Sequence, residues 1–404
     1  MNILLLTDMP PSNNFTAGIV LSQLVQFLLE ENHKICCYAV VDKTLQPDIP
    51  QEIISQMPYA VSEKPIEYWG AMKHGFFLSL VMNNYIAAFE LPKIADQVIE
   101  FAKENDVDLI WSVVQGQTMI KIVRRIALQV GKPYTVQVWD PPQWWLKEYK
   151  FDPFTAHSVM KEFKKMIFQS QTCLTASWAM AEEYYNHYNA KCIPVIPGLP
   201  KVDLIENIKK DDSKFLIGFS GQAYAKKEFK AFFDALDYMN WKHENKQIEV
   251  KLYGRQFDVE DSIHIKKCGY MEQNQLLAEL QNMDLLYCPY FFDKKYELIS
   301  RLSFPSKLTS YLSIKKPVFF HGPILSSPGR FINDYNAGFI CNTLEYRKIA
   351  EQLPEIISND KSLKEKADNG YEAFKAFLTN EKMKESFFKS LGIEKEVDHE
   401  STAN

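Results

Sequence analysis

Residues 193–200, Ile-Pro-Val-Ile-Pro-Gly-Leu-Pro, separate two stretches of chain that share one pattern. Three prolines and a glycine within eight residues cannot continue a helix, so we predict a linker here. On both sides of it, short apolar runs alternate with segments of helical periodicity. Strands that alternate with helices predict parallel sheets with right-handed crossovers. The sequence therefore predicts an α/β fold with two Rossmann-like domains, at residues 1–195 and 201–375, followed by a helix and tail at 376–404.

The periodicity places most elements of both halves. The predicted strands of the first half are 3–6, 34–41, 108–114 and 134–138, and its helices begin near Gly18 and cover 95–103, 119–130 and 180–188. The predicted strands of the second half are 215–219, 248–253, 285–288 and 318–320, and its helices are 229–238, 276–283 and 307–313. Residues 349–391 are expected to be helical.

Composition excludes some classes of protein. The chain has 404 residues, a net charge of −5 and ordinary globular proportions of apolar and charged residues, so we expect no nucleic-acid partner held by bulk positive charge. Its seven cysteines show no metal-binding spacing, which favours a reduced, cytoplasmic chain. The sequence contains no run of 18 apolar residues, so we expect no transmembrane helix. We interpret the apolar residues 3–6 as a strand rather than a signal peptide.

Candidate functional residues follow the strands, because ligands of open parallel sheets bind at the carboxyl ends of the strands. Gly18 precedes a helix whose amino end can bind a diphosphate, or it is a plain turn glycine. The segment 218–222, Gly-Phe-Ser-Gly-Gln, has the same placement and contains Gly221 and Gln222. Lys226 and Lys227 follow it, either within reach of a phosphate or as a solvated face.

The segment Arg301–Leu312 carries a lysine where a helix should begin. Pro305 marks the start of that helix, and Ser306 and Lys307 fall in its first turn. A lysine is unfavourable at the positive end of a helix unless an anion is bound beside it, so we favour an anion site with Arg301 nearby. The alternative is a surface cation paired with Glu297 or Asp293.

Two aromatic segments of the first half leave alternatives open. Residues 139–145, Trp-Asp-Pro-Pro-Gln-Trp-Trp, follow a strand, so Asp140 and the tryptophans would bind a sugar or line a domain interface. Gln115 and Gln117 also follow a strand and are expected to face the same ligand. For residues 68–89 we expect a buried core helix, with a membrane-facing or acceptor-binding helix as the alternative.

These features together resemble retaining glycosyltransferases of the GT-B fold, the glycosyltransferase 4-like group. The resemblance rests on the glycine of the first loop, the Pro-Gly linker, Gly-Phe-Ser-Gly followed by lysine, and the run Phe-Pro-Ser-Lys-Leu-x-x-Tyr-Leu-x-x-x-Lys-Pro-Val at 304–318. It implies that the two domains face each other across a cleft and that the C-terminal helix crosses back to the first domain. It also implies transfer of a sugar from a nucleotide-sugar donor, such as a UDP-sugar, to a glycan, glycolipid or protein acceptor, in polysaccharide, glycolipid or glycoconjugate assembly. Peripheral contact with the inner face of a membrane is a further alternative.

The resemblance implies roles for thirteen residues. The catalytic residues would be Asp140, Lys227 and Lys307. The substrate-binding residues would be Gly18, Gly221, Gln222, Tyr270, Met271, Arg301, Ser303, Pro305, Ser306 and Ser310. We expect no cofactor and no metal: the nucleotide sugar is a substrate, and the only Asp-x-Asp match, Asp106-Val-Asp108, precedes its strand and is interpreted as a turn.

The chain departs from the family at positions that touch the donor. Leu302 and Ser310 occupy the places of two glutamates common in the family, Gln222 that of an arginine, and Trp139 that of a histidine. A non-catalytic nucleotide-binding or scaffold protein is therefore the alternative function, and an inverting enzyme is a third. A NAD-dependent dehydrogenase would require a Gly-x-Gly-x-x-Gly motif, which is not found.

Overall fold

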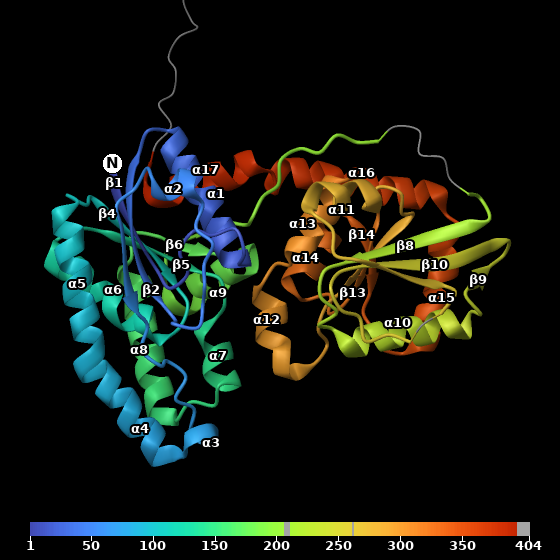
Figure 1. Cartoon of the computed structure of the whole chain (residues 1–404). Helices are drawn as coiled ribbons and strands as arrows, with labels where there is room; N and C mark the ends of the chain where they lie inside the picture. Colours follow the sequence, from blue (N-terminus) through green and yellow to red (C-terminus); the bar gives the residue numbers. More distant parts are fainter. Residues whose placement is uncertain (206–210, 261, 394–404) are drawn as a thin grey trace, which may run out of the picture. The chain divides into compact units, whose positions relative to one another are not determined.

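The computed structural model describes residues 1–205, 211–260 and 262–393, which form two compact units. The first unit comprises Met1–Val195 together with the chain from Lys384 onward, and the second comprises Ile196–Met383. Each unit is a parallel sheet covered by helices, coloured blue to green and yellow-green to red in Figure 1. The division falls within the proline-rich segment 193–200.

The first unit contains a seven-stranded sheet of order β3-β2-β1-β4-β5-β6-β7 in which all neighbours are parallel. Its strands are β1 (Asn2–Thr7), β2 (Lys34–Val41), β3 (Tyr59–Glu63), β4 (Leu109–Val114), β5 (Tyr134–Val138), β6 (Cys173–Thr175) and β7 (Cys192–Pro194). Its helices are α1 (Thr16–Glu30), α2 (Gln51–Ile54), α3 (Ala71–His74), α4 (Phe76–Tyr85), the π-helical turn η1 (Ile86–Glu90), α5 (Leu91–Glu104), α6 (Gln117–Val130), α7 (Pro142–Glu148), α8 (Pro153–Gln169) and α9 (Trp178–Tyr188).

The second unit repeats this order as β11-β10-β8-β12-β13-β14, with the short β9 antiparallel to β10. Its strands are β8 (Lys214–Ser220), β9 (Lys242–His243), β10 (Lys246–Tyr253), β11 (Ile265–Gly269), β12 (Leu285–Pro289), β13 (Val318–His321) and β14 (Gly338–Cys341). Its helices are α10 (Lys226–Tyr238), α11 (Gln273–Leu280), the 3₁₀ turn η2 (Lys294–Tyr296), α12 (Glu297–Leu302), α13 (Ser306–Ser313), α14 (Ser327–Asp334), α15 (Tyr346–Ile357) and α16 (Asp360–Phe377). Both units are therefore Rossmann-like, as predicted.

The last helix, α17 (Asn380–Leu391), returns to the first unit. The ring of Phe387 lies 4.8 Å from that of Trp111 on β4, and Lys384 forms an ion pair of 2.6 Å with Glu31. Phe388 contacts His33 through an edge-to-face pair of rings. These contacts confirm the expected return of the C-terminal helix to the first domain.

The expectation of a buried core helix over residues 68–89 is wrong. This stretch forms a loop, α3, α4 and most of η1, and α4 exposes its apolar side chains while it buries Ser79 and Asn83. The apolar composition of this stretch predicts burial, but composition alone does not show which face of a helix is buried. No helix in the described part of the chain is long and apolar enough to cross a membrane.

Candidate functional site

The sheet order of each unit predicts a ligand site at one point on the carboxyl edge of its sheet. Each sheet runs outward in both directions from its first strand, so the crossovers diverge between β1 and β4 and between β8 and β12. Ligands of doubly wound sheets bind beside such a switch point. The residues that follow β1, β4 and β8 are therefore the first to inspect.

In the second unit, Lys307 lies beside this point with its ammonium group buried. The residue belongs to the first turn of α13, and its Nζ has no hydrogen-bond partner among the described residues. The Nζ lies 4.3 Å from the centroid of the Phe219 ring on β8 and 4.4 Å from that of Tyr224. Aromatic faces attract a cation, but they accept none of its three N–H groups as a hydrogen-bonding anion would.

Gly221 supplies the other side of the same place. It follows β8 with a φ of +97°, a conformation that favours glycine, and a Cβ added to it would lie 3.9 Å from both Cε and Nζ of Lys307. The preceding Ser220 donates its backbone N–H to the Tyr311 hydroxyl at 2.8 Å, which ties this turn to α13. We call Gly221, Lys307 and the amino end of α13 the candidate anion site.

The environment of Lys307 disfavours its positive charge. Burial lowers the pKa of Lys307 to about 8, because the ammonium loses water and gains no carboxylate. A pKa of about 8 leaves most of the group protonated at pH 7, so a buried positive charge has no carboxylate partner among the residues that the structure describes. The alternative of a surface cation paired with Glu297 or Asp293 does not describe Lys307. A bound anion would supply the missing partner.

Lys227, the other predicted phosphate lysine, has a different environment. It begins α10 with Lys226, and its Nζ forms an exposed ion pair of 2.7 Å with Asp293. This pair raises the pKa of Lys227. Lys227 is thus a charged surface lysine whose counter-ion is Asp293.

The remaining predicted donor residues surround α12 and α13 or lie beyond β11. The Ser303 hydroxyl is buried and has no hydrogen-bond partner within residues 1–205, 211–260 and 262–393, and the Ser303 carbonyl accepts from the Tyr290 hydroxyl at 3.1 Å. The Ser310 hydroxyl donates to the Ser306 carbonyl at 3.4 Å within α13. The others are Arg301, exposed in the last turn of α12; Pro305, which caps α13; Ser306, its exposed first residue; the exposed Gln222; and Tyr270 and Met271, which follow β11.

In the first unit, Asp140 follows β5, and burial raises the pKa of its carboxyl group. Trp145 does not serve as a sugar platform, because it is buried against the rings of Tyr68 and Phe151 at 6.4 and 5.9 Å. Trp139 and Trp144 are partly exposed, and the indole N–H of Trp144 is buried without a partner. The prediction of a tryptophan cluster on a ligand is thus wrong for Trp145.

Gly18 lies inside the first turn of α1 rather than in the preceding loop. A Cβ at this position would lie 1.9 Å from the Ser12 hydroxyl oxygen. The loop after β1 therefore packs directly on α1, and this packing requires a glycine at position 18. The packing is a second reason for the glycine, in addition to the predicted role at a phosphate. At the opposite edge of the sheet, Asp106 has a φ of +46° and Asp108 accepts from the backbone N–H of Asn2. This confirms the turn expected at Asp106-Val-Asp108.

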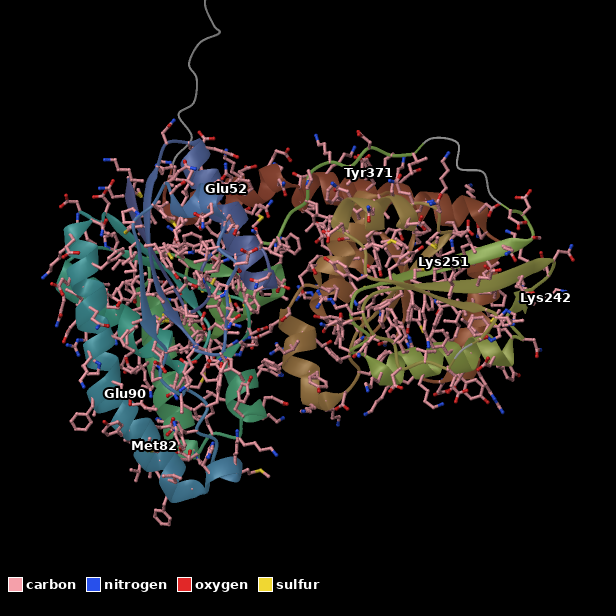
Figure 2. The ribbon with its side chains drawn as sticks, in the orientation of Figure 1. Glu52, Met82, Glu90, Lys242, Lys251 and Tyr371 are labelled. Atoms are coloured by element: carbon pink, nitrogen blue, oxygen red, sulfur yellow. The ribbon has the colours of Figure 1, made fainter. Side chains whose placement is uncertain are left out.

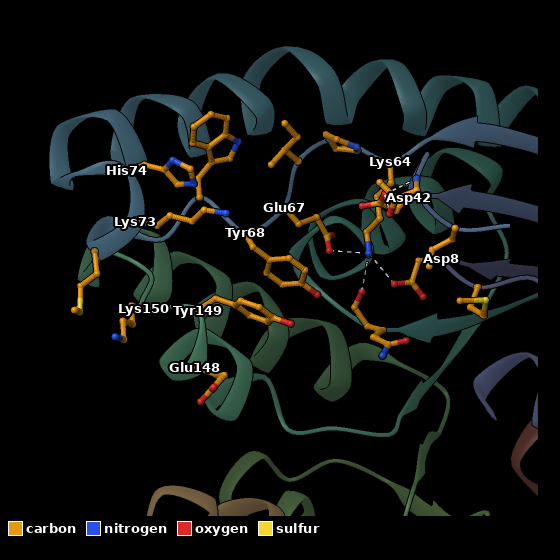
Figure 3. A pocket seen from close by; sticks show the side chains of 18 residues that line it. Asp8, Asp42, Lys64, Glu67, Tyr68, Lys73, His74, Glu148, Tyr149 and Lys150 are labelled. Carbon is orange, nitrogen blue, oxygen red and sulfur yellow. Dashed lines mark hydrogen bonds and ion pairs between the residues drawn. The ribbon is translucent and has the colours of Figure 1, made fainter. Parts of the chain in front are cut away.

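The sequence did not predict a pocket of about 900 Å³ at the carboxyl edge of the first sheet, which we call the strand-end pocket (Figure 3). Its lining comprises Asp8, Met9, Asp42, Thr44, Leu45, Lys64, Pro65, Ile66, Glu67, Tyr68, Trp69, Met72, Lys73, His74, Gln115, Glu148, Tyr149 and Lys150. The residues come from the ends of β1, β2, β3 and β4 and from α3 and α7. The rings of Tyr68 and Tyr149 stack at 3.9 Å along it.

A buried ion triad lies at the inner end of this pocket. Lys64 Nζ lies 2.7 Å from both Asp8 Oδ2 and Glu67 Oε2, and it also donates to the Gln115 carbonyl at 3.3 Å (Figure 3). Burial raises the pKa of Asp8, whereas the two carboxylates raise that of Lys64. The other carboxylate oxygen of Asp8, Oδ1, is buried and unpartnered among the described residues. It is therefore available to accept from a ligand hydroxyl.

The two glutamines that were predicted to face a ligand lie in different surroundings. Gln115 lines the strand-end pocket, but Gln117 is buried and donates to the Glu67 carbonyl at 2.6 Å and to Asn83 Oδ1 at 3.0 Å. Glu67 in turn accepts from the backbone N–H of Thr118, in the first turn of α6, at 2.6 Å. Gln117 is thus a structural link between the triad and α4.

Solved structures share the whole fold of this chain. Sucrose-phosphate synthase from Thermosynechococcus elongatus aligns with a TM-score of 0.66 and 11% identity over 96% of this chain and 97% of that one. The lipopolysaccharide outer core galactosyltransferase WaaB aligns with a TM-score of 0.67 and 13% identity, over 97% of this chain and 99% of that one. HepE of Anabaena, solved in complex with UDP, aligns with a TM-score of 0.63 and 13% identity, over 97% of this chain and 100% of that one. No protein-family model and no curated sequence matches this chain. The chain therefore has the GT-B fold of glycosyltransferases.

Proposed function

We propose that this protein transfers a sugar from a nucleotide-sugar donor to an acceptor, with the donor diphosphate bound at the candidate anion site. One observation carries the proposal: Lys307 holds a buried ammonium without a hydrogen-bond partner in the described part of the chain, beside Gly221 and the amino end of α13. A diphosphate would accept hydrogen bonds from this ammonium and from the free N–H groups of the first helical turn.

The same groups suit the chemistry of donor cleavage. As the bond between the sugar and the diphosphate breaks, negative charge grows on the leaving phosphate, and Lys307 is positioned to stabilise it in a place with little water. Because a protein cation supplies this charge, we propose a reaction that needs no metal ion. We also propose retention at the anomeric carbon, which the resemblance to retaining glycosyltransferases implies. Asp140, whose pKa is raised by burial, is the proposed acidic group on the acceptor side.

A UDP-linked sugar is the first donor to test, since HepE, which shares the fold, was solved with UDP and with UDP-glucose. The purified protein is incubated with UDP-glucose and a panel of hydroxylated glycan and glycolipid acceptors, and released UDP and the glycoside product are measured, with and without EDTA. We expect release above the uncatalysed rate, unaffected by EDTA, and an α-configured product by NMR. Loss of turnover in EDTA contradicts metal independence, and a β-configured product contradicts retention.

The non-catalytic alternative also has structural support. Leu302 is buried, and the Ser310 hydroxyl is bonded within its own helix, so neither residue replaces a carboxylate that would touch the donor sugar. A nucleotide-binding protein without transferase activity would bind UDP through Lys307 but release none from any UDP-sugar. A panel of UDP-sugars and other nucleotide sugars separates the two functions.

A further inference from the structure

Helix α4 is amphipathic in the reverse of the usual sense. Its buried residues are polar: Ser79 is fully buried and Asn83 is 2% exposed. Its solvent-facing row is apolar: Phe77, Val81 and Tyr85, spaced four residues apart, are 79%, 61% and 48% exposed. A surface helix normally shows the opposite arrangement.

Hydrogen bonds fix this orientation. Asn83 donates to the Trp69 carbonyl at 3.2 Å and accepts from Gln117 at 3.0 Å. Ser79 bonds the Trp69 carbonyl and lies 3.2 Å from Asp152 Oδ2. Rotating α4 to bury its apolar row would leave the Trp69 carbonyl and the Gln117 amide buried without these hydrogen-bond partners. The apolar row is therefore held outward by the fold.

The exposed row belongs to a larger patch, which we call the apolar stripe. It comprises Met72, Phe76, Phe77, Leu78, Val81, Tyr85, Phe89 and Phe154, all exposed. The rings of Phe76 and Phe154 lie 6.2 Å apart, which joins α4 to the start of α8, and those of Tyr85 and Phe89 lie 5.3 Å apart. Figure 2 labels Met82 on α4 and Glu90, the last residue of η1, which follows α4 directly.

The charges near the stripe are mainly positive at the α3 end. Residues 76–89 contain no ionisable acid or base other than Tyr85. Lys73 and Lys150 are exposed at the α3 end, where the Ala71 N–H donates to the Lys150 carbonyl at 2.8 Å, and Lys147 is exposed on the adjoining α7. Glu148 in the same region is only partly exposed, and Glu90 lies beyond the last aromatic residue.

We propose that the apolar stripe docks into an anionic lipid surface. Aromatic and aliphatic side chains on one helix face, bordered by lysines, are the features that hold an amphipathic helix in the interface of a bilayer with negative head groups. The aromatic rings suit the head-group level, and the lysines meet the lipid phosphates. The uncharged centre of the stripe and its cationic border favour docking on an anionic lipid surface over permanent exposure to water.

The position of the stripe also narrows the class of acceptor. Met72, Lys73 and His74 line the strand-end pocket, and Met72 belongs to the stripe, so the pocket and the docking surface share a border. The unpartnered Asp8 Oδ1 in that pocket can accept from a hydroxyl group. Resting on the proposed function, we assign the acceptor to the hydroxylated head group of a membrane lipid.

Docking is tested by flotation with vesicles of phosphatidylcholine plus about one-third phosphatidylglycerol, and with phosphatidylcholine alone. The stripe variant is Phe77→Ser, Val81→Ser and Phe89→Ser combined, and Leu128→Ser, equally exposed on α6, is the matched control. We expect anionic vesicles to bind the wild type and Leu128→Ser alike, and the stripe variant at least tenfold more weakly. Lys73→Glu with Lys150→Glu should lower binding to anionic vesicles only.

Absence of wild-type binding, or equal binding by the stripe variant, overturns the proposal. So does a wild-type dimer, seen by light scattering, that the stripe variant converts to monomer without any vesicle binding by the wild type. UDP affinity, measured separately by calorimetry, should be unchanged in the stripe variant. Vesicle binding without UDP binding would leave the docking surface intact and contradict only the proposed function and the acceptor assignment.

Discussion

The ammonium of Lys307 lies 4.3 Å from the centre of the Phe219 ring and has no hydrogen-bond acceptor among the described residues. A pKa of about 8 in place of the usual 10.5 means that the folded protein disfavours this charge by roughly 3 kcal/mol. A site that retains such a charge is preorganised for an anion, and its cost in stability is one that functional sites commonly carry.

Replacing this lysine should therefore stabilise the protein without ligand. Lys307→Met keeps the length of the side chain and removes the buried charge. We expect its free energy of unfolding at pH 7, from urea denaturation, to exceed that of the wild type by about 1–3 kcal/mol. Lys230→Met removes an exposed lysine paired with Asp234 on α10 and should change stability by less than about 1 kcal/mol.

The advantage of Lys307→Met should shrink as the pH rises. The folded pKa of Lys307 lies near 8 and the unfolded value near 10.5, so between them the unfolded chain binds more protons than the folded one. The stability of the wild type then rises with pH relative to the variant. An advantage that stays constant from pH 7 to pH 10 would show that Lys307 is not the titrating group.

Nucleotide affinity should fall at alkaline pH. The diphosphate binds the protonated lysine, so above pH 8 binding must take up a proton, and the affinity should decrease by up to about tenfold per pH unit. Calorimetry of UDP binding from pH 6.5 to pH 9.5 checks this for the wild type. In Lys307→Met the affinity should be low and nearly independent of pH. The same slope in both proteins would assign the titration to another group.

The triad of the first unit gives a prediction in which the substitution destabilises the protein rather than stabilising it. In Lys64→Met, Asp8 and Glu67 keep their buried carboxylates but lose the shared cation, so we expect a loss of about 3–5 kcal/mol at pH 8. Loss of the cation should raise the pKa of Asp8 further. Lowering the pH to 5 favours the protonated carboxyl group and should recover part of the loss. A loss that is equal at both pH values would contradict strong coupling within the triad.

Gly18 distinguishes packing from phosphate binding. Gly18→Ala places a Cβ against the Ser12 hydroxyl and should destabilise the first unit by about 1–3 kcal/mol. Adding Ser12→Gly removes the two nearest contacts and should restore part of that stability. If Gly18→Ala leaves the urea midpoint unchanged but weakens UDP binding, the glycine serves the ligand rather than the packing.

Much of the fold followed from periodicity. The strands Lys34–Val41 and Tyr134–Val138 have their predicted bounds. The first is apolar throughout after Lys34, and in the second apolar residues alternate with Thr135 and Gln137. Periodicity did not predict β3, β7, β9, β11 or β14. Each is short, and β3 and β11 are mostly exposed edge strands, so their apolar pattern is weak.

The two candidate sites differ in how far the sequence predicted them. Lys307 was identified because a lysine at a helix start conflicts with the helix dipole, a local signal that does not need the tertiary structure. Lys64 and Glu67 follow the unpredicted β3 and meet Asp8 only through the sheet order, 56 residues away from Lys64. The reversed amphipathicity of α4 was equally out of reach, because the polar partners that orient it come from distant segments.

The central claim is tested most directly by UDP affinity in the wild type and Lys307→Met, measured by calorimetry at pH 7 with Lys230→Met as the control. Loss of a charge-assisted hydrogen bond of about 1.5–3 kcal/mol corresponds to a roughly 10- to 150-fold higher dissociation constant. We predict that loss in Lys307→Met, together with its higher stability, and wild-type affinity in Lys230→Met. Equal UDP affinity in the wild type and Lys307→Met, or no binding of any nucleotide by the wild type, would contradict the account.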